Sequence, residues 1–236
     1  MPEDLERRAR MHAALGEPLR LAIIDQLALG DAAPGELSTR FGVPTNLLAH
    51  HLRRLDAAGL IRRLRSEGDH RRGYVQLRLD DPAVASLAGP AGSGGSGTIG
   101  SARRVVFVCT HNSARSQLAA AAWRQVSQLP AASAGTHPAT QVHPLALAAG
   151  RRHGLPMTDA RTAHVAQVVH EGEDLVVAVC DSAHEELHPT PRRLHWSVPD
   201  PVRIGTDAAF EVAYAEIARR VRRLASAVPD AAARER

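Results

Sequence analysis

The chain has 236 residues and a formal net charge of +4, and all 29 of its lysine-plus-arginine residues are arginine. This length is enough for two modest domains, each with its own core. No run of about eighteen apolar residues could cross a membrane, and the first residues are acidic, unlike a signal peptide. We therefore expect a cytoplasmic protein with no membrane partner. The two cysteines cannot form a disulfide framework, and no Cys/His cluster has zinc-finger spacing, so no metal site is expected.

Apolar residues at helical spacing predict four helices in the first half of the chain. Pro34 suits the first turn of the third helix, and Gly42 opens a tight turn before the fourth. Two short helices joined by a glycine-containing turn form a helix-turn-helix. The four helices are expected over residues 5–15, 19–29, 34–41 and 45–58.

The fourth helix has one apolar face. Leu48, Leu52 and Leu55 recur at helical spacing and are expected to pack inward. The outer face would then carry Thr45, Asn46, Ala49, His50 and Arg53.

A strand pair is expected after these helices. Residues 60–65 and 74–79 alternate in polarity around the polar segment 66–73, which predicts a two-stranded wing. Between residues 37 and 79, nine arginines stand against three acidic residues. The positive charge is therefore concentrated on the helix-turn-helix and the wing, where a nucleic acid would bind.

Residues 13–79 resemble the ArsR-type winged-helix repressors, especially in Leu15-Gly16-Glu17-Pro18-Leu19-Arg20-Leu21 and in 50–60. The resemblance implies a homodimer on a double-stranded DNA operator, with one recognition helix per protomer. Relatives that sense arsenite or metals often carry cysteines here, and this half has none, so direct thiolate sensing is not expected. The alternative is a winged helix used only for protein contacts. The candidate DNA contacts are Thr45, Asn46, His50 and Arg53 from the helix and Arg71 and Arg72 from the wing.

A Gly/Ser tract over 90–101 is typical of a flexible tether. We therefore predict a DNA-binding domain over 1–82, a linker over 83–102 and a second domain over 103–236.

The second half alternates strands with helices, which indicates an α/β domain with a small parallel sheet. Strands are expected over 104–108, 132–136, 174–180 and 193–198, and helices over 115–128, 143–153, 162–169 and 207–227.

The first of these strands ends in a candidate anion site. An apolar run leads into Cys109, and a helix is expected to begin near Arg115. Peptide N–H groups of a loop at a helix N-terminus point toward an anion, and Arg115 can add a bidentate fork. In that field Cys109 is expected to supply a thiolate nucleophile near neutral pH, with Asn112 bracing the loop and Ser116 donating to the sulfur.

Cys109, five residues, Arg115 and Ser116 together resemble the signature of the low-molecular-weight protein tyrosine phosphatases and their arsenate reductase relatives. The resemblance covers about 103–228 and implies a four-stranded doubly wound sheet with the anion loop after its first strand. It also implies that Cys109 and Arg115 are catalytic. The residues expected to bind the oxyanion are Thr110, His111, Asn112, Ser113, Ala114, Arg115 and Ser116.

The resemblance places the general acid at Asp200, which stands between Pro199 and Pro201. A turn-forming aspartate is the alternative interpretation. His111 occupies a position that is often small in the family. It is expected either to narrow the pocket or to lie on its rim.

Arsenate and phosphate are nearly isosteric, so two reactions stay open. An arsenate reductase needs a second thiol, and Cys180 stands where thioredoxin-coupled reductases place one. Their third cysteine is missing from 181–187. We therefore expect no bound cofactor and an external thiol of the mycothiol or glutathione type, with its reductant partner. A buried structural Cys180 is the alternative.

The favoured function is a DNA-binding regulator fused to an arsenate reductase. No tyrosine follows Asp200 until Tyr214, whereas eukaryotic phosphatases of the family carry a tyrosine pair there, and His195-Trp196 is also closer to the reductases. The alternatives are a low-molecular-weight protein tyrosine phosphatase and a non-catalytic repressor that senses an oxyanion.

Overall fold

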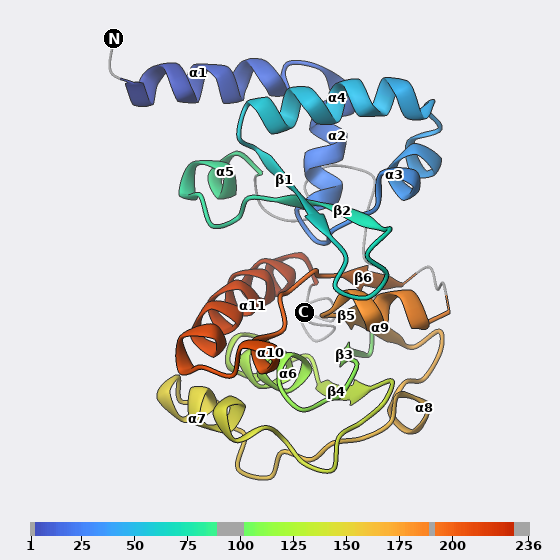
Figure 1. Cartoon of the computed structure of the whole chain (residues 1–236), viewed down its shortest axis with the longest axis vertical. Helices are drawn as coiled ribbons and strands as arrows, with labels where there is room; N and C mark the ends of the chain where they lie inside the picture. The colour runs from blue at the N-terminus through green and yellow to red at the C-terminus, as the bar shows by residue number, and fades with distance from the viewer. Residues whose placement is uncertain (1–2, 89–101, 189–191, 229–236) are drawn as a thin grey trace, which may run out of the picture. The chain divides into compact units, whose positions relative to one another are not determined.

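The computed structural model describes residues 3–88, 102–188 and 192–228. The chain forms two compact units, one mostly N-terminal and one mostly C-terminal (Figure 1). Among the described residues, no helix is both long and apolar enough to cross a membrane.

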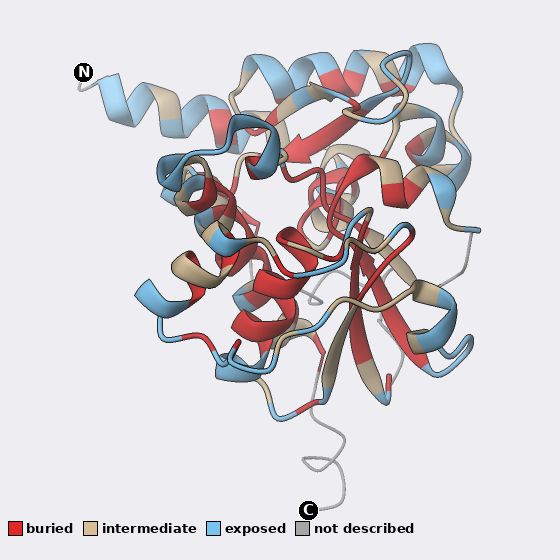
Figure 2. Cartoon of the chain, turned by 60° about the horizontal axis from the view of Figure 1, so that its bottom comes forward, coloured by how far each residue is buried: buried red, intermediate tan, exposed pale blue. Residues whose placement is uncertain are grey.

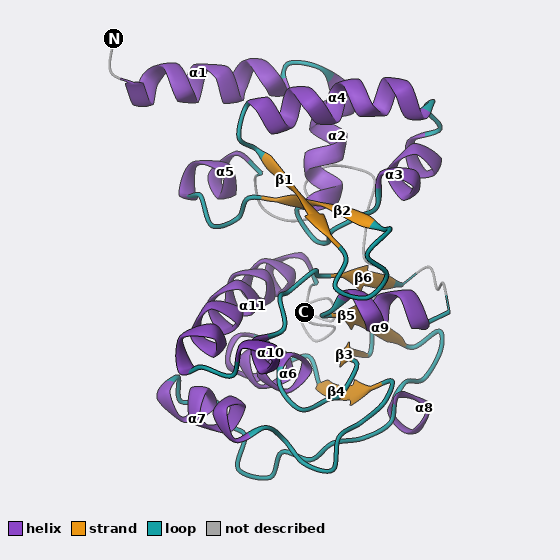
Figure 3. Cartoon of the chain, in the orientation of Figure 1, coloured by secondary structure: helices purple, strands orange, loops and turns teal. Residues whose placement is uncertain are grey.

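The N-terminal unit is a winged helix-turn-helix, as predicted (Figure 3). Strands β1 and β2 pair antiparallel with Ile61 opposite Leu77, and Ala32 adds a bridge to Val75. The elements are α1 Glu3–Leu15, α2 Pro18–Leu27, α3 Pro34–Phe41, α4 Thr45–Ala57, β1 Ile61–Arg65, β2 Gly73–Leu77 and α5 Pro82–Leu87.

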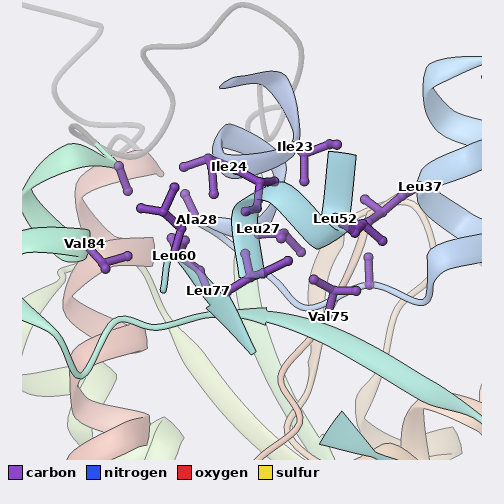
Figure 4. Packing of buried hydrophobic residues seen from close by; sticks show 14 of the residues in the cluster. Ile23, Ile24, Leu27, Ala28, Leu37, Leu52, Leu60, Val75, Leu77 and Val84 are labelled. Carbon is purple, nitrogen blue, oxygen red and sulfur yellow. The ribbon is translucent and has the colours of Figure 1, made fainter. Parts of the chain in front are cut away.

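The turn between α3 and α4 is fixed by a left-handed glycine. Gly42 has φ 62°, and its N–H donates to the carbonyls of Ser38 and Thr39, which ends α3. On α4 the three leucines predicted to face inward, Leu48, Leu52 and Leu55, are all buried. Figure 4 shows Leu52 among apolar side chains from α2, α3 and the wing. The core therefore holds α4 by its apolar face and leaves the opposite face to solvent.

Helix α5 was not predicted. Pro82 occupies its first turn, and the Asp81 carboxylate caps it by accepting from the Ala83 N–H. Val84 of α5 is buried in the same core. All of the helix after Pro82 lies in the stretch 83–102 that was predicted to be the linker, and residues 89–101 of that stretch are outside the described residues.

The C-terminal unit is the predicted α/β domain, with a four-stranded, all-parallel sheet in the order β4-β3-β5-β6. Helix α6 covers β3 and β4 and packs on α11, whereas α9 contacts β3 and β5 from the other side of the sheet (Figure 1). The elements are β3 Arg104–Cys109, α6 Arg115–Val126, β4 Ala131–Gly135, α7 Pro144–Arg152, α8 Val165–Val168, β5 Asp174–Ala178, α9 Asp181–Glu186, β6 Arg193–His195, α10 Pro201–Ile204 and α11 Asp207–Ala227.

Burial follows from this layering. Strand β5 is buried along its whole length and β3 at all but its first residue (Figure 2). Such continuous apolar runs are typical of parallel strands covered on both faces. The strand order places the end of β3 between β4 and β5, at the carboxyl edge where ligands bind in open α/β sheets.

Two predicted elements in this unit were too long, and two short helices were missed. The helix expected over 162–169 is only α8, because Ala163 and His164 first extend along β4, where the Gly135 N–H donates to the Ala163 carbonyl. The strand expected over 193–198 ends at His195, although the Trp196 N–H still donates to the Ala178 carbonyl. The short helices α9 and α10 were not predicted.

Candidate functional site

The anion loop, residues 109–116, joins β3 to α6 at the carboxyl edge of the sheet. Cys109 ends β3 and is 3% exposed. Asn112 has φ 49°, a left-handed conformation that turns the loop back over the strand end. Its side chain stabilises that turn, because Oδ1 accepts from the Ala163 N–H at 2.9 Å and Nδ2 donates to Ser116 Oγ at 2.8 Å.

Those two contacts set the direction of the hydrogen bond at the sulfur. Ser116 Oγ accepts from Asn112, so its own proton is available to Cys109 Sγ, 3.1 Å away. A thiolate can only accept a hydrogen bond, so Ser116 is the donor when Cys109 is ionised. Asn112, Ser116 and Cys109 form a relay that stabilises the nucleophilic form of the sulfur.

Arg115 begins α6 and is buried. Its Nη1 donates to the Val198 carbonyl at 2.8 Å, and its Nη2 lies 3.2 Å from Asp200 Oδ2. Burial works against the charged form, but the neighbouring Cys180, Cys109 and Asp200 outweigh it and raise the pKa of the guanidinium. Arg115 therefore stays a cation at any working pH.

Residues 197–200, here called the acid loop, bring Asp200 to this cation. The loop follows β6 and ends where Asp200 caps α10, with Oδ1 accepting from the Val202 N–H at 3.1 Å. A carboxyl group held beside the guanidinium is placed to exchange a proton with a group bound there. The proline-flanked aspartate of the sequence thus lies beside Arg115.

Cys180 lies at the adjacent strand end, with Sγ 3.5 Å from Thr110 Oγ1. It is buried, and burial raises the pKa of its thiol to about 11, with the nearby Cys109 adding to the rise. Cys180 is therefore a neutral thiol near pH 7, unlike a sulfur prepared for nucleophilic attack.

Gly135 at the end of β4 lies directly behind the loop. A Cβ there would come within 2.7 Å of the Thr110 carbonyl oxygen and 3.0 Å of the Asn112 N atom. Any larger residue would push the loop outward. Gln117 braces the same loop, with Nε2 donating to the carbonyls of Asn112 and Arg161. Neither role was predicted, because the bracing partners are far apart in the sequence.

A buried contact between His195 and Asp181 supports the strand that leads to the acid loop. His195 Nε2 lies 2.9 Å from Asp181 Oδ1, and the His184 ring stacks on His195 with centroids 4.1 Å apart. Burial opposes ionisation of Asp181, but the hydrogen bonds from His195, the Glu67 N–H and Ser197 together outweigh it and lower the pKa of the carboxyl. No pattern in the sequence indicated this contact.

The remaining predicted loop residues lie at or near the site. Ala114 is buried and Ser113 half-buried, and the Ser113 carbonyl accepts from the His143 N–H at 2.9 Å. His111 is exposed, and its carbonyl accepts from the Ala139 N–H. Its exposure is that expected of a residue on the rim.

The candidate DNA-contacting residues lie in the N-terminal unit. Thr45, Asn46, His50 and Arg53 are exposed along α4, whereas Ala49 is half-buried. Leu47 is 42% exposed on the same helix. Both wing arginines, Arg71 and Arg72, are also exposed.

One ionisable residue of α4 faces inward and was not predicted. His51 is buried, with Nδ1 3.4 Å from Glu17 Oε2, and Glu17 caps α2 by accepting from the Leu19 and Arg20 N–H groups. The pKa of Glu17 is lowered because those N–H groups and His51 outweigh its desolvation. This contact helps hold α4 against the start of α2.

Residues 104–234, more than half of the chain, match the family model of low molecular weight phosphotyrosine protein phosphatase. The chain belongs to that family. Residues 17–63 match the model of the bacterial regulatory proteins of the arsR family. The chain is therefore a fusion of an ArsR-type helix-turn-helix with a domain of the phosphatase family.

The similar curated proteins are arsenate reductases. That of Halalkalibacterium halodurans is 31% identical over 131 residues, which are 51% of this chain and 94% of that protein. That of Bacillus licheniformis is 30% identical over 136 residues, 53% of this chain and 96% of that protein. A solved arsenate reductase from Archaeoglobus fulgidus has 30% identity and a TM-score of 0.46, covering 51% of this chain and 98% of that one. The C-terminal unit is a cysteine-dependent enzyme of the arsenate reductase or tyrosine phosphatase kind.

Replacing Ser116 with alanine should slow alkylation of Cys109 by iodoacetamide at pH 7 by about tenfold, because a hydrogen bond to a charged group contributes about 1.5–3 kcal/mol. Ser113→Ala on the same loop is the matched control and should alkylate at the wild-type rate. Mass spectrometry of the labelled peptide gives the rate at each cysteine. Equal rates in the wild type and Ser116→Ala would show that Ser116 does not stabilise the thiolate.

Proposed function

We propose that this protein is a DNA-binding transcriptional regulator fused to an arsenate reductase that uses an external thiol. The observation that carries the proposal is the grouping of Cys109, Ser116, Arg115 and Asp200 around one anion loop. The only other cysteine, Cys180, is a buried neutral thiol. The site is thus built to form a sulfur–oxyanion bond and lacks an internal route to carry oxidation outward.

The first half of the reaction follows from the geometry. The Cys109 thiolate attacks arsenic, with Arg115 and the loop N–H groups stabilising the negative charge on the oxygens. An oxygen of arsenate leaves as water after receiving a proton, and Asp200 is placed to donate it. The product is a Cys109 sulfur–arsenic(V) adduct.

The second half transfers two electrons. An external thiolate attacks the Cys109 sulfur, the sulfur–arsenic bond breaks, and its electron pair stays on arsenic, which leaves as arsenite. A second external thiol resolves the mixed disulfide and restores Cys109. Overall, arsenate and two thiols give arsenite, a disulfide and water. A small thiol of the mycothiol or glutathione type, with its reductant partner, supplies the electrons.

Cys180 is not the reductant in this proposal. Its pKa of about 11 leaves little thiolate at neutral pH, and burial separates it from solvent. A Cys109–Cys180 disulfide would also need a further cysteine to pass oxidation to a surface partner, and the chain has only these two. The similarity to arsenate reductases of Halalkalibacterium halodurans and Bacillus licheniformis supports arsenate as the substrate.

The second candidate is a tyrosine phosphatase, favoured by the family model that matches 104–234. Cys109, Arg115 and Asp200 would then act on a phosphate ester, and water would replace the thiol. A third candidate is an oxyanion sensor without turnover, since an anion loop binds whether or not it reacts.

For the N-terminal unit we propose operator binding as a homodimer, with Thr45, Asn46, His50 and Arg53 in the major groove. Arg71 and Arg72 would meet the DNA backbone or the minor groove. Helix α1 supports a dimer contact, because only Met11 of its residues is buried and Leu5 is 45% exposed. We place the DNA-binding domain at 1–82, extended through α5, and the enzyme domain at 103–236.

Cys109→Ser should abolish arsenate reduction and aryl phosphate hydrolysis while arsenate binding persists, because it removes the nucleophile and keeps the loop. Asp200→Asn should slow aryl phosphate hydrolysis by about 10²–10⁴ through loss of proton donation. Arsenite formation with mycothiol or glutathione, measured beside p-nitrophenyl phosphate hydrolysis, tests both. Activity retained by Cys109→Ser would reject the mechanism, and phosphate hydrolysis without any arsenite would favour the phosphatase.

Removing Arg71 and Arg72 together should weaken binding to all DNA sequences and flatten its salt dependence, because each phosphate contact adds about one unit to the slope of log K against log salt. The matched control removes Arg203 and Arg222, which are exposed on the enzyme unit and belong to neither the wing nor the proposed dimer helix. Fluorescence anisotropy across a salt series measures both effects. If affinity and salt slope match the wild type, the wing does not contact DNA.

A further inference from the structure

Three aromatic side chains pack beneath the site, one from each segment that builds it. Phe107 lies on β3 and Trp123 on α6, and Trp196 directly precedes the acid loop. The Phe107 ring centroid lies 6.0 Å from that of Trp123 and 5.7 Å from that of Trp196, and all three side chains are fully buried. The cluster therefore joins the three segments that carry the nucleophile, the guanidinium and the candidate acid.

A buried cation also packs on Trp196. The Arg220 guanidinium carbon of α11 lies 5.9 Å from the centroid of the Trp196 ring, and Arg220 is 3% exposed. A guanidinium over an indole face is attracted to the ring's negative potential. Arg220 Nε donates to Glu216 Oε1 at 2.7 Å, so the cation keeps a carboxylate partner inside the unit. Burial opposes ionisation of Glu216, but Arg220 and Arg219 together outweigh it and lower the pKa of that carboxyl.

The buried Glu216–Arg220 ion pair has an energetic cost that would be unnecessary if Trp196 only filled space in the core. Burying an ion pair carries a desolvation penalty, and apolar residues of similar volume often stabilise a core as well or better. An arginine fixed by Glu216 holds a planar ring in one orientation, whereas an aliphatic side chain leaves it freer to shift. The ion pair therefore suggests that the orientation of Trp196 matters.

Trp196 is well placed to transmit such a constraint. Its backbone N–H donates to the Ala178 carbonyl at 2.7 Å, which fixes the start of the acid loop against β5. The loop is only residues 197–200, and both Val198 and Asp200 of that loop contact Arg115. A displacement of Trp196 would therefore reach the guanidinium and the candidate acid together.

We propose that Trp196, packed against Phe107 and Arg220, is a positioning residue for the acid loop, and that Arg220 fixes its orientation. Neither residue touches the oxyanion. They act by setting where Asp200 and the Val198 carbonyl meet Arg115. The inference rests on the Cys109-dependent function proposed above and assigns α11 a part in it.

The test uses the full chain with Arg220 and Glu216 changed together, as Glu216→Gln with Arg220→Met, so that the Glu216 carboxylate is not left buried without Arg220. Arg219, which also pairs with Glu216, has a side chain that is 35% exposed and can meet solvent. Arg222→Met, exposed on the same helix, is the matched control. The first readout is the arsenate concentration that half-protects Cys109 from iodoacetamide. This arsenate concentration should rise about threefold or more in the double variant, because the Val198 carbonyl and Asp200 no longer hold Arg115 in a fixed position. It should stay unchanged in the control.

The second readout is hydrolysis of aryl phosphates whose leaving phenols differ in acidity. A displaced acid should slow the least acidic leaving group by about tenfold or more and the most acidic one by less than about twofold. Trp196→Phe, which keeps an aromatic ring, should retain more of the protonation-dependent rate than Trp196→Leu. A residue that serves only the core would slow all substrates equally.

Equal slowing across the phenol series, with unchanged arsenate protection and a lowered melting temperature, would overturn the proposal. A wild type without Cys109-dependent turnover would instead reject the proposed function. Arsenate protection then decides the positioning role alone, because it needs no turnover: unchanged protection in the double variant contradicts that role, and weakened protection supports it.

Discussion

The enzyme unit depends on keeping one guanidinium charged inside protein. Removing Arg115 from water costs several kcal/mol unless its charge and its N–H groups find partners. The structure supplies partners that include the Val198 carbonyl and Asp200 of the acid loop. The neighbouring Cys180 and Cys109 also favour the charged guanidinium. An incoming oxyanion would find a cation already oriented, so little reorganisation is needed when it binds.

The surroundings of Arg115 also give Cys109 and Cys180 different environments. Both lie in the field of Arg115 and both have a hydroxyl nearby, Ser116 at 3.1 Å from Cys109 and Thr110 at 3.5 Å from Cys180. At Cys109 the hydroxyl proton is directed to the sulfur, because Ser116 Oγ already accepts from Asn112. Cys180 has burial and the nearby Cys109 against it, and its pKa rises to about 11. The two sulfurs therefore differ in environment, although Cys109 ends β3 and Cys180 closely follows the neighbouring β5. This difference in environment is why the proposed chemistry places the electrons for arsenate outside the chain.

Much of this was predictable from local patterns. The recognition helix, the first strand of the sheet and the long terminal helix 207–227 follow from apolar spacing and from caps such as Thr206, whose hydroxyl accepts from the Ala209 N–H. The predictions that were wrong concern elements whose ends depend on contacts with residues distant in the sequence. Helix α8 is short because residues 163–164 align with β4 before it starts.

The contacts around the site were the least predictable. Three such contacts depend on residues far apart in the sequence. The Val198 carbonyl accepts from Arg115, Gly135 leaves no room behind the anion loop, and Arg220 lies over the Trp196 ring. No periodicity or motif encodes such packing. The identity of Cys109, Arg115 and Asp200 could be proposed from the sequence, but their support required the fold.

The most direct test of the proposed reaction is a single turnover of arsenate without added thiol, comparing the wild type with Cys180→Ser. We predict no arsenite from either protein until mycothiol or glutathione is added, after which both should reduce arsenate at rates within about twofold, because Cys180 lacks the thiolate form needed for exchange. Stoichiometric arsenite from the wild type without thiol, absent in Cys180→Ser and accompanied by a Cys109–Cys180 disulfide, would contradict the external-thiol mechanism.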